Sequence, residues 1–163
     1  MSDGMLQDWA ANKGNLRSCL VLAFFRIARR CHHLPPAIRW LGWPCLAAYT
    51  LIVEWVLGIE LSYKASIGPG LKLYHGVGLV VHEASVLGKN CTLRQCTTIG
   101  NRKGADDVPV IGDDVEIGCN AVVIGTITIG SGAKIGAGSV VIADVAPGVS
   151  VAGNPARPVG RAR

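Results

Sequence analysis

The sequence predicts a mainly β protein: a parallel β-helix, which is a solenoid of six-residue repeats, preceded by two α-helices. Three observations support this prediction. Glycine is abundant, with 21 residues, and follows no three-residue period, which favours many tight backbone corners. Residues up to about 59 carry apolar side chains at helical spacing instead. Beyond them, aliphatic residues recur at every sixth position, most regularly at Ile111, Ile117, Val123, Ile129, Ile135 and Val141.

Residues 1–59 are expected to form a helical segment. From Asn15 onward, apolar residues recur every three or four positions, which predicts a first helix that ends near His33. The Pro35–Pro36 pair then interrupts the helical pattern, because proline cannot donate a backbone hydrogen bond. The stretch 37–58 is strongly apolar and predicts a second helix.

The helical segment is open to two interpretations. The apolar run 41–59 has nearly the length of a membrane span, but Pro44 and Glu54 interrupt it and disfavour a bilayer crossing. Its tryptophans, with the arginines of the first helix, suit a peripheral contact with anionic lipid. Alternatively, the helices make a protein contact, either packed in an oligomer or as a cap over the open end of the β domain. No cleaved targeting segment is expected, so the predicted location is cytoplasmic, at the inner face of the cytoplasmic membrane if the lipid contact forms.

Residues 60–150 are expected to form the β-helix. A six-residue period is neither helical nor strictly alternating, and it is typical of a solenoid whose flat sides are short strands. The aliphatic residue points into the prism, and a small residue four positions later completes the corner. The corner positions hold Val115, Ala121, Ile127, Ala133 and Ser139.

The first part of the repeat contains an irregularity. An early series keeps the period at Ile67, Leu73 and Leu79. A second series follows one residue out of phase, at Val80, Val86, Thr92 and Thr98. The shift predicts a single-residue bulge near His82.

Two further segments depart from the repeat. Residues 101–109, NRKGADDVP, are polar and predict a loop thrown out of one coil, where rigid scaffolds often carry sites. Residues 151–163 leave the repeat and predict an extended tail along the outside of the prism.

Composition argues against several classes of function. The formal charge is +5, but the basic residues are scattered, so no nucleic-acid partner is expected. The six cysteines sit singly without a C-x-x-C pair, which favours reduced thiols in a cytoplasmic protein. The repeat region holds two histidines, His75 and His82, so a zinc site of three histidines is not expected and no metal is predicted.

Particular motifs add a resemblance that covers about residue 58 to the end. The segments IGSGAKIGAGSVV (129–141) and AGNPARPVG (152–160) resemble the hexapeptide-repeat acyltransferases. Within that family, HGVGLVVHE (75–83) and TLRQCTTIGN (92–101) are similar to the serine O-acetyltransferase branch. With its N-terminal helices, the chain resembles still more closely the acetyltransferases of exopolysaccharide clusters, such as those for colanic acid.

The resemblance implies a left-handed β-helix, a homotrimer, and acetyl-CoA bound in the groove between neighbouring prisms. It also implies that His75 is the general base that takes a proton from the acceptor hydroxyl. Such a base needs an acceptor on its other ring nitrogen. Glu60, which aligns with an aspartate of the serine enzymes, and Glu83 are the two candidates; either is otherwise a solvated or salt-bridged acid.

Departures from the serine pattern bear on the acceptor. Serine enzymes carry Asp before the active-site His, where this chain has Tyr74, and an Arg-His pair in the loop, where it has Asp107 and Val108. Losing a cation that pairs a carboxylate disfavours an amino acid, whereas a sugar hydroxyl makes no such demand. His82 replaces a small residue and is expected to contact the acceptor or to fill the bulge.

The prediction is therefore an O-acetyltransferase that modifies a sugar or lipid-linked oligosaccharide in exopolysaccharide biosynthesis. Serine O-acetylation is the alternative, and a β-helix without catalysis is the remote one. For acetyl-CoA, small residues that match family positions facing the pantetheine arm are Gly100, Cys119 and Ala137. Lys134 and Arg157 are candidates for its phosphates, although each of these five residues also suits ordinary solenoid structure.

Overall fold

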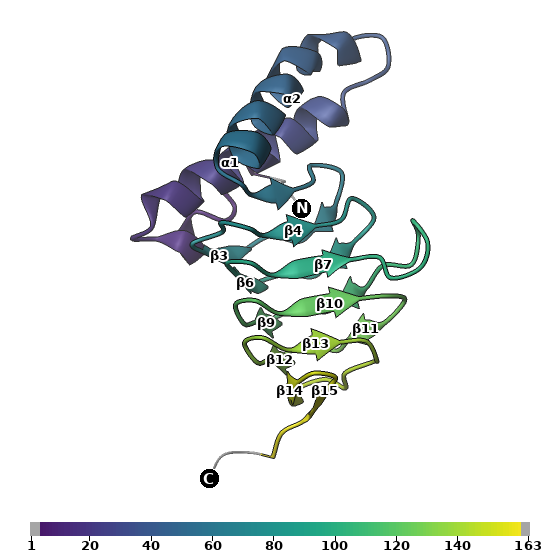
Figure 1. Ribbon diagram of the computed structural model, residues 1–163. Coiled ribbons are helices and arrows are strands. Elements are labelled where there is room, and N and C mark those ends of the chain that lie inside the picture. The colour runs from purple at the N-terminus through teal and green to yellow at the C-terminus, as the bar shows by residue number, and fades with distance from the viewer. Residues whose placement is uncertain (1–3, 161–163) are drawn as a thin grey trace.

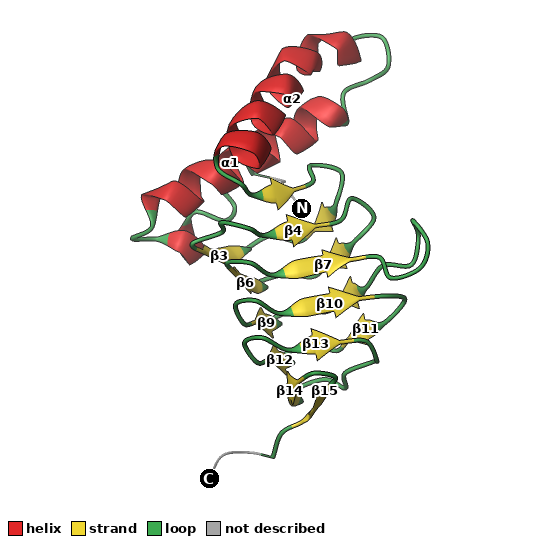
Figure 2. Ribbon diagram, in the orientation of Figure 1, coloured by secondary structure: helices red, strands yellow, loops and turns green. Residues whose placement is uncertain are grey.

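The computed structural model describes residues 4–160 as a β-helix of about five turns with a helical hairpin against its N-terminal end (Figure 1). Figure 2 shows that helix is confined to the first third of the chain and that strands make up the rest. The predicted fold class is confirmed.

Three sheets form the sides of the prism, and we name them A, B and C. Sheet A contains β1 (Glu60–Leu61), β4 (Val80–Val81), β7 (Thr98–Gly100), β10 (Val122–Ile124) and β13 (Val140–Val141). Sheet B contains β2 (Ser66–Ile67), β5 (Val86–Leu87), β8 (Val110–Ile111) and β11 (Thr128–Ile129). Sheet C contains β3 (Lys72–Tyr74), β6 (Thr92–Arg94), β9 (Glu116–Ile117), β12 (Lys134–Ile135), β14 (Ser150–Gly153) and β15 (Ala156–Pro158).

The prism core consists of the predicted inward positions. Strands pair in parallel with the coil above and below, as in the register Leu61↔Val81 and Leu73↔Leu93. All six aliphatic positions from Ile111 to Val141 are buried, as are the five small corner residues that follow them by four positions. Stacked coils thus bury one continuous aliphatic column, which is the main favourable term for folding.

The predicted phase of the second coil is wrong. Its buried positions are Val81, Leu87, Leu93 and Ile99, while the residue before each faces outward and is partly exposed. The inward positions Leu73 and Val81 are eight residues apart instead of six, so the chain carries two extra residues between β3 and β4. The irregularity therefore lies around His75 and not at His82.

The first predicted helix is confirmed as α1 (Leu16–His32). It begins where the Asn15 side chain accepts a hydrogen bond from the backbone of Ser18 at 3.2 Å, the usual way to satisfy a free N-terminal donor. Instead of one second helix, the chain forms a 3-10 turn η2 (Arg39–Gly42), a short α2 (Trp43–Tyr49) and a π-helix η3 (Thr50–Val56). A further 3-10 turn, η1 (Ala10–Asn12), precedes α1.

Buried polar side chains attach this helical segment to the first coil. Asp8 accepts from the backbone N–H of Leu71 at 2.9 Å, and Asn12 bonds the N–H of Leu73 and the carbonyl of Leu71. The first coil has no coil above it, so these backbone groups need other partners. The interpretation of the helices as a cap is therefore supported.

Arg26 completes the attachment. Its guanidinium pairs with Asp8 at 2.7 Å and donates to the carbonyls of Ile67 and Gly68, both at 2.7 Å. Ser18 and Tyr49 add hydroxyl hydrogen bonds to carbonyls of the first coil at 2.8 and 2.7 Å. The cap is held by individually placed polar groups as well as by apolar packing.

The outer face of the hairpin is apolar. Trp40, Trp43 and Trp55 are 62%, 66% and 76% exposed, and Leu41, Leu51 and Val56 are exposed beside them. Among the described residues, none of the helices combines the length and apolarity needed to cross a bilayer.

At the other end of the prism, the chain folds back on itself. β15 pairs antiparallel with β14, with Ala152 opposite Arg157, so the predicted extended tail begins as a hairpin on the edge of sheet C. Residues 161–163 lie outside the described part of the chain.

Candidate active site

His75 occupies the irregular corner between β3 and β4. Its φ is +66°, a left-handed value that few side chains adopt, and the imidazole is exposed. The corner is held by a local bond from Gly76 N–H to the carbonyl of Tyr74 at 2.9 Å, and by a bond from Gly78 N–H to the carbonyl of Gly58, before β1, at 2.7 Å. The two extra residues thus place His75 on the surface, away from the buried aliphatic column.

Two glycines make this corner possible. Gly76 and Gly78 have φ of +66° and +69°. A Cβ on Gly76 would lie 3.0 Å from Ile59 Cδ1, and one on Gly78 would lie 3.1 Å from Cys96 Sγ. Both positions therefore require glycine for backbone conformation and for space.

Within residues 4–160, the His75 imidazole has no hydrogen-bond partner. The two histidine rings that do form such bonds are those of His33, which bonds the carbonyl of Arg29, and His82, which accepts from the backbone of Ala84 at 3.2 Å. The predicted orienting bond from a carboxylate to His75 is thus not formed in this structure. A catalytic hydrogen bond often tightens only when substrate binds.

Glu60 is the first residue of β1, and its backbone N–H donates to the carbonyl of Leu79, in the His75 corner, at 2.8 Å. Its exposed side chain lines a cavity of about 350 Å³ on the sheet A side of the molecule. Glu54, from the π-helix η3, lines the same cavity. Burial, and then the charge of Glu60, raise the pKa of the Glu54 carboxyl.

Glu83 and His82, which follow β4, also line that cavity. Glu83 pairs with Lys64 at 2.6 Å, and this hydrogen bond lowers the pKa of Glu83. His75 and Glu83 are thus at opposite ends of β4, and the Glu83 carboxylate is already engaged. Of the two predicted orienting acids, Glu60 lies nearer to the His75 corner along the fold.

The hydroxyl-bearing residues Thr50, Ser62 and Tyr63 also line the cavity, and the sequence analysis did not single them out. Glu54 was noted only as an interruption of an apolar helix. It is the single acid between Asp8 and Glu60, and a lone carboxylate in an apolar run is a signal for a site.

Asp107 lies in the loop 101–109, which projects between β7 and β8 (Figure 1). Its carboxylate accepts hydrogen bonds from the hydroxyl and N–H of Thr126 and from the N–H of Lys103. The bond from the Thr126 hydroxyl is the main cause that lowers the pKa of Asp107. In this structure the predicted substrate-binding carboxylate serves the loop itself.

The predicted cofactor residues divide between two edges of the prism. Cys119 and Ala137 lie on the edge between sheets C and A, the same edge as His75, where Gly138 N–H donates to the Cys119 carbonyl at 2.8 Å. Gly100 ends β7 at the edge between sheets A and B, where a Cβ would lie 3.9 Å from that of His82. Sheet A separates the two edges within one protomer.

Tyr74, Lys134 and Arg157 lie on sheet C. The Tyr74 ring is flanked by the cations of Lys72 and Arg94, at 5.1 and 4.6 Å from its centroid. Lys134 pairs with Glu116 at 2.8 Å, and exposed Arg157 donates to the carbonyl of Ala156 at 3.1 Å. No group of histidine, cysteine and acidic side chains suited to holding a metal ion occurs among the described residues.

A regular β-helix built from six-residue repeats places the protein in the hexapeptide-repeat class. The family model "Bacterial transferase hexapeptide (six repeats)" matches residues 109–143. An Escherichia coli (strain K12) protein named "Putative colanic acid biosynthesis acetyltransferase WcaB" is 38% identical over 164 aligned residues, covering 94% of this chain and 97% of the relative. The chain belongs to the hexapeptide-repeat family and is an acetyltransferase of it.

Serine acetyltransferases are the second group of relatives. The enzyme of Escherichia coli (strain K12) is 42% identical over 105 residues, which span 63% of this chain but only 38% of the relative. Soybean serine acetyltransferase superimposes with a TM-score of 0.80 at 33% identity, covering 95% of this chain and 67% of that one. The Brucella abortus enzyme in complex with coenzyme A gives 0.75 at 30% identity, covering 90% and 57%.

Proposed function

We propose that this protein transfers the acetyl group of acetyl-CoA to a hydroxyl of a sugar during exopolysaccharide assembly. The observation that carries the choice of a sugar is the charge of the cavity beside Glu60. It is lined by three carboxylates, those of Glu54, Glu60 and Glu83, and its one lysine, Lys64, is paired with Glu83.

Such a cavity suits a polyhydroxylated acceptor. Carboxylates accept hydrogen bonds from sugar hydroxyls, and the hydroxyls of Thr50, Ser62 and Tyr63 add neutral donors and acceptors. The carboxylate of an amino acid would instead meet negative charge without a free cation to pair with. Tyr74 and Asp107 stand where serine enzymes carry other residues, which supports the same choice.

In the proposed reaction, His75 accepts the proton of the acceptor hydroxyl as its oxygen attacks the thioester carbonyl. The C–S bond then breaks, and the proton passes from His75 to the departing thiolate, which leaves an O-acetyl ester and free CoA. We assign Glu60 as the residue that orients the imidazole, because Glu83 is engaged by Lys64 at the far end of β4.

For acetyl-CoA, the proposed track is the edge that carries His75, Cys119 and Ala137. Along it the coils approach closely: a Cβ on Gly118 would lie 2.5 Å from the backbone nitrogen of Ala137. A smooth edge of this kind lets an extended pantetheine arm lie along the backbone. Coenzyme A in the Brucella abortus relative supports this ligand.

We further propose a homotrimer in which the loop edge of one protomer, with Gly100 and Asp107, faces the His75 edge of the next. That arrangement would unite residues that sheet A separates within one chain. The exposed tryptophans and arginines of the hairpin favour contact with the inner face of the cytoplasmic membrane and an acceptor carried there on lipid.

The test measures thiol release from acetyl-CoA with L-serine, and with a panel of mono- and disaccharides, offered as acceptors. The control is His75→Asn, because asparagine tolerates the left-handed backbone of this corner better than alanine does. We expect sugar-dependent release, an O-acetyl sugar by mass spectrometry, and loss of both in the variant.

Robust serine-dependent release that needs His75 would overturn the sugar proposal in favour of serine acetylation, which the serine acetyltransferase relatives make the second candidate. If the chain does not bind acetyl-CoA at all, the catalytic proposal fails and the β-helix is structural.

A further inference from the structure

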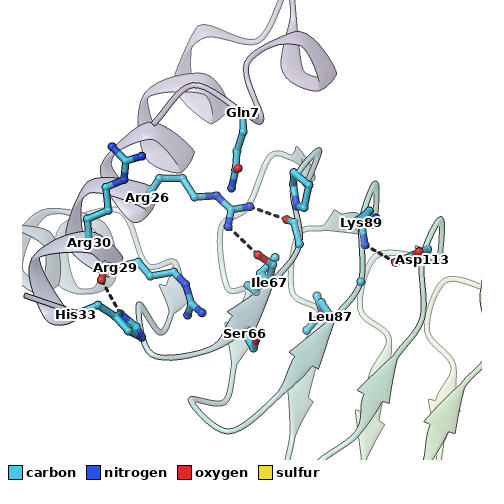
Figure 3. Close-up of a pocket in the computed structure, with 13 residues that line it drawn as sticks. Gln7, Arg26, Arg29, Arg30, His33, Ser66, Ile67, Leu87, Lys89 and Asp113 are labelled. Carbon is cyan, nitrogen blue, oxygen red and sulfur yellow. Dashed lines mark hydrogen bonds between the residues drawn. The ribbon is translucent and has the colours of Figure 1, made fainter. Parts of the chain in front are cut away.

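A second cavity, of about 500 Å³, lies between α1 and the edge that joins sheets B and C, away from the His75 edge. We call it the α1 groove. Figure 3 shows its two walls: Arg26, Arg29, Arg30 and His33 from the helix side, and residues of successive coils, including Lys89, from the prism side. The proposed acetyl transfer uses none of these residues.

The α1 groove has an excess of positive charge. Arg26 is neutralised by Asp8, with which it forms a buried pair. Among the other charged side chains of the lining that the structure describes, Arg30 and Lys89 are exposed cations, and Asp113 is the one carboxylate. The Asp113 carboxylate accepts the backbone N–H of Lys89 at 2.7 Å, so it serves the coil next to it.

Two of the guanidinium groups are held in place by the prism. Arg26 and Arg29 both donate to backbone carbonyls of the first coil, Arg26 to Ile67 and Gly68 and Arg29 to Lys64 and Ala65. These bonds fix the inner wall of the groove. Arg30 and Lys89 are exposed on opposite walls, and no side-chain partner occurs for either within residues 4–160.

A simpler role accounts for part of this charge. Arg29 and Arg30 lie in the last turn of α1, where cations offset the negative end of the helix dipole. That role does not explain Lys89, which belongs to the second coil, nor the cavity between the two walls. Cations on both sides of an open space are the arrangement that binds a polyanion.

We propose that the α1 groove binds a diphosphate group, with Arg30 and Lys89 as its two exposed cations. The group could belong to a lipid headgroup or to a soluble molecule. Residues 9–53 contain no acidic side chain that would repel an anion from either source. The three exposed tryptophans of the hairpin would suit contact with a lipid surface. This inference goes beyond the proposed function and does not depend on His75.

The test is calorimetric titration of the full chain with inorganic pyrophosphate at low salt. We expect Arg30→Gln and Lys89→Gln each to weaken binding about tenfold, the loss of one charge-assisted contact. The matched controls are Arg39→Gln in the same hairpin and Lys103→Gln in the loop, which remove exposed cations outside the groove. His75→Asn should bind as tightly as the parent, so a failed catalytic proposal would leave this result unchanged.

A second arm identifies the source, using sedimentation with vesicles of phosphatidic acid in phosphatidylcholine and with phosphatidylcholine alone. Vesicle binding that pyrophosphate competes away, and that both groove variants lose, supports the site with a lipid headgroup. Pyrophosphate binding without vesicle binding supports it with a soluble ligand. The proposal is overturned if pyrophosphate does not bind, or if the control variants weaken binding as much as the groove variants do.

Discussion

Among the described residues, polar side chains are buried and hydrogen bonded in the cap, but exposed and without hydrogen bonds in the His75 corner. Asp8, Asn12 and Arg26 are 3%, 4% and 5% exposed, and each is hydrogen bonded to the backbone of the first coil. His75 and Glu60 are exposed, and neither side chain forms a hydrogen bond within the described residues. The cap residues should therefore contribute to stability, whereas the role we propose for the corner residues is chemical, and the two sets should respond differently to substitution.

The largest expected effect belongs to His75→Asn. We expect acetyl transfer to fall by about 10²- to 10⁴-fold, the contribution of a positioned general base. The melting temperature should stay within about 2 °C of the parent, because an exposed side chain without partners adds little stability. Steady-state kinetics and thermal unfolding on the same preparation check both statements. Unchanged kinetics would remove His75 from the reaction.

The reverse result is expected from Asp8→Ala. The substitution leaves the buried Arg26 guanidinium without its counter-charge and the Leu71 N–H without an acceptor. Breaking a buried pair in this way costs about 3–5 kcal/mol, which corresponds to a fall of about 6–20 °C in melting temperature for a chain of this size. Activity per folded molecule should persist at low temperature.

The control for that prediction is Asp106→Ala, which removes an exposed carboxylate from the loop and should leave the melting temperature unchanged. A parent-like melting temperature for Asp8→Ala would mean that the cap does not hold the first coil. Chemical denaturation followed by circular dichroism gives an independent measure of the same free energy of unfolding.

A smaller effect is expected from Asp107→Asn in the loop. The neutral side chain accepts more weakly from the Thr126 hydroxyl and the Lys103 N–H, so hydrogen exchange at these two residues should accelerate while the prism amides stay protected. Because folding lowers the pKa of Asp107, the bonds of its carboxylate stabilise the loop above the ordinary value of about 3.9. That protection should be lost as the pH falls through the lowered value.

The same exchange experiment at pH 7 and at acid pH separates the carboxylate from general loosening. In the parent, amides of the loop should lose protection at acid pH before those of β10 do. In Asp107→Asn this pH dependence should disappear. If both proteins show it equally, another group controls the loop.

The sequence predicted the prism well because the six-residue period alone identifies which side chains point into the core. Ile111 to Val141 could be placed inward without any knowledge of contacts between coils. It predicted the second coil poorly, because Val80 and Val86 are aliphatic like their neighbours Val81 and Leu87. The later pairs favour the true phase, since Leu93 and Ile99 are aliphatic and the residues before them are threonines. The two extra residues at His75 therefore appeared as a bulge seven residues too late, although the glycines on either side of Val77 mark the true position.

The six-residue repeat could not predict the contacts of the cap or the residues of the acidic cavity. Asp8 contacts Leu71 across 63 residues, and no local pattern pairs them. Glu54 meets Glu60 only because the π-helix η3 runs into β1 beside the His75 corner. Such pairs depend on how two unlike halves dock, and sequence spacing within either half carries no information about that.

The smallest effect should come from Glu83→Gln, and its value lies in comparison with Glu60→Gln. Both acids line the cavity of about 350 Å³, but Glu83 is exposed and paired with Lys64, and an exposed pair of this kind contributes little. We expect Glu83→Gln to change kcat by less than about threefold. Glu60→Gln should lower kcat at least tenfold, because the imidazole would lose the acceptor that we propose orients it. Equal effects of the two substitutions would assign both acids to acceptor binding, whereas the reverse order would make Glu83 the orienting residue despite its bond to Lys64.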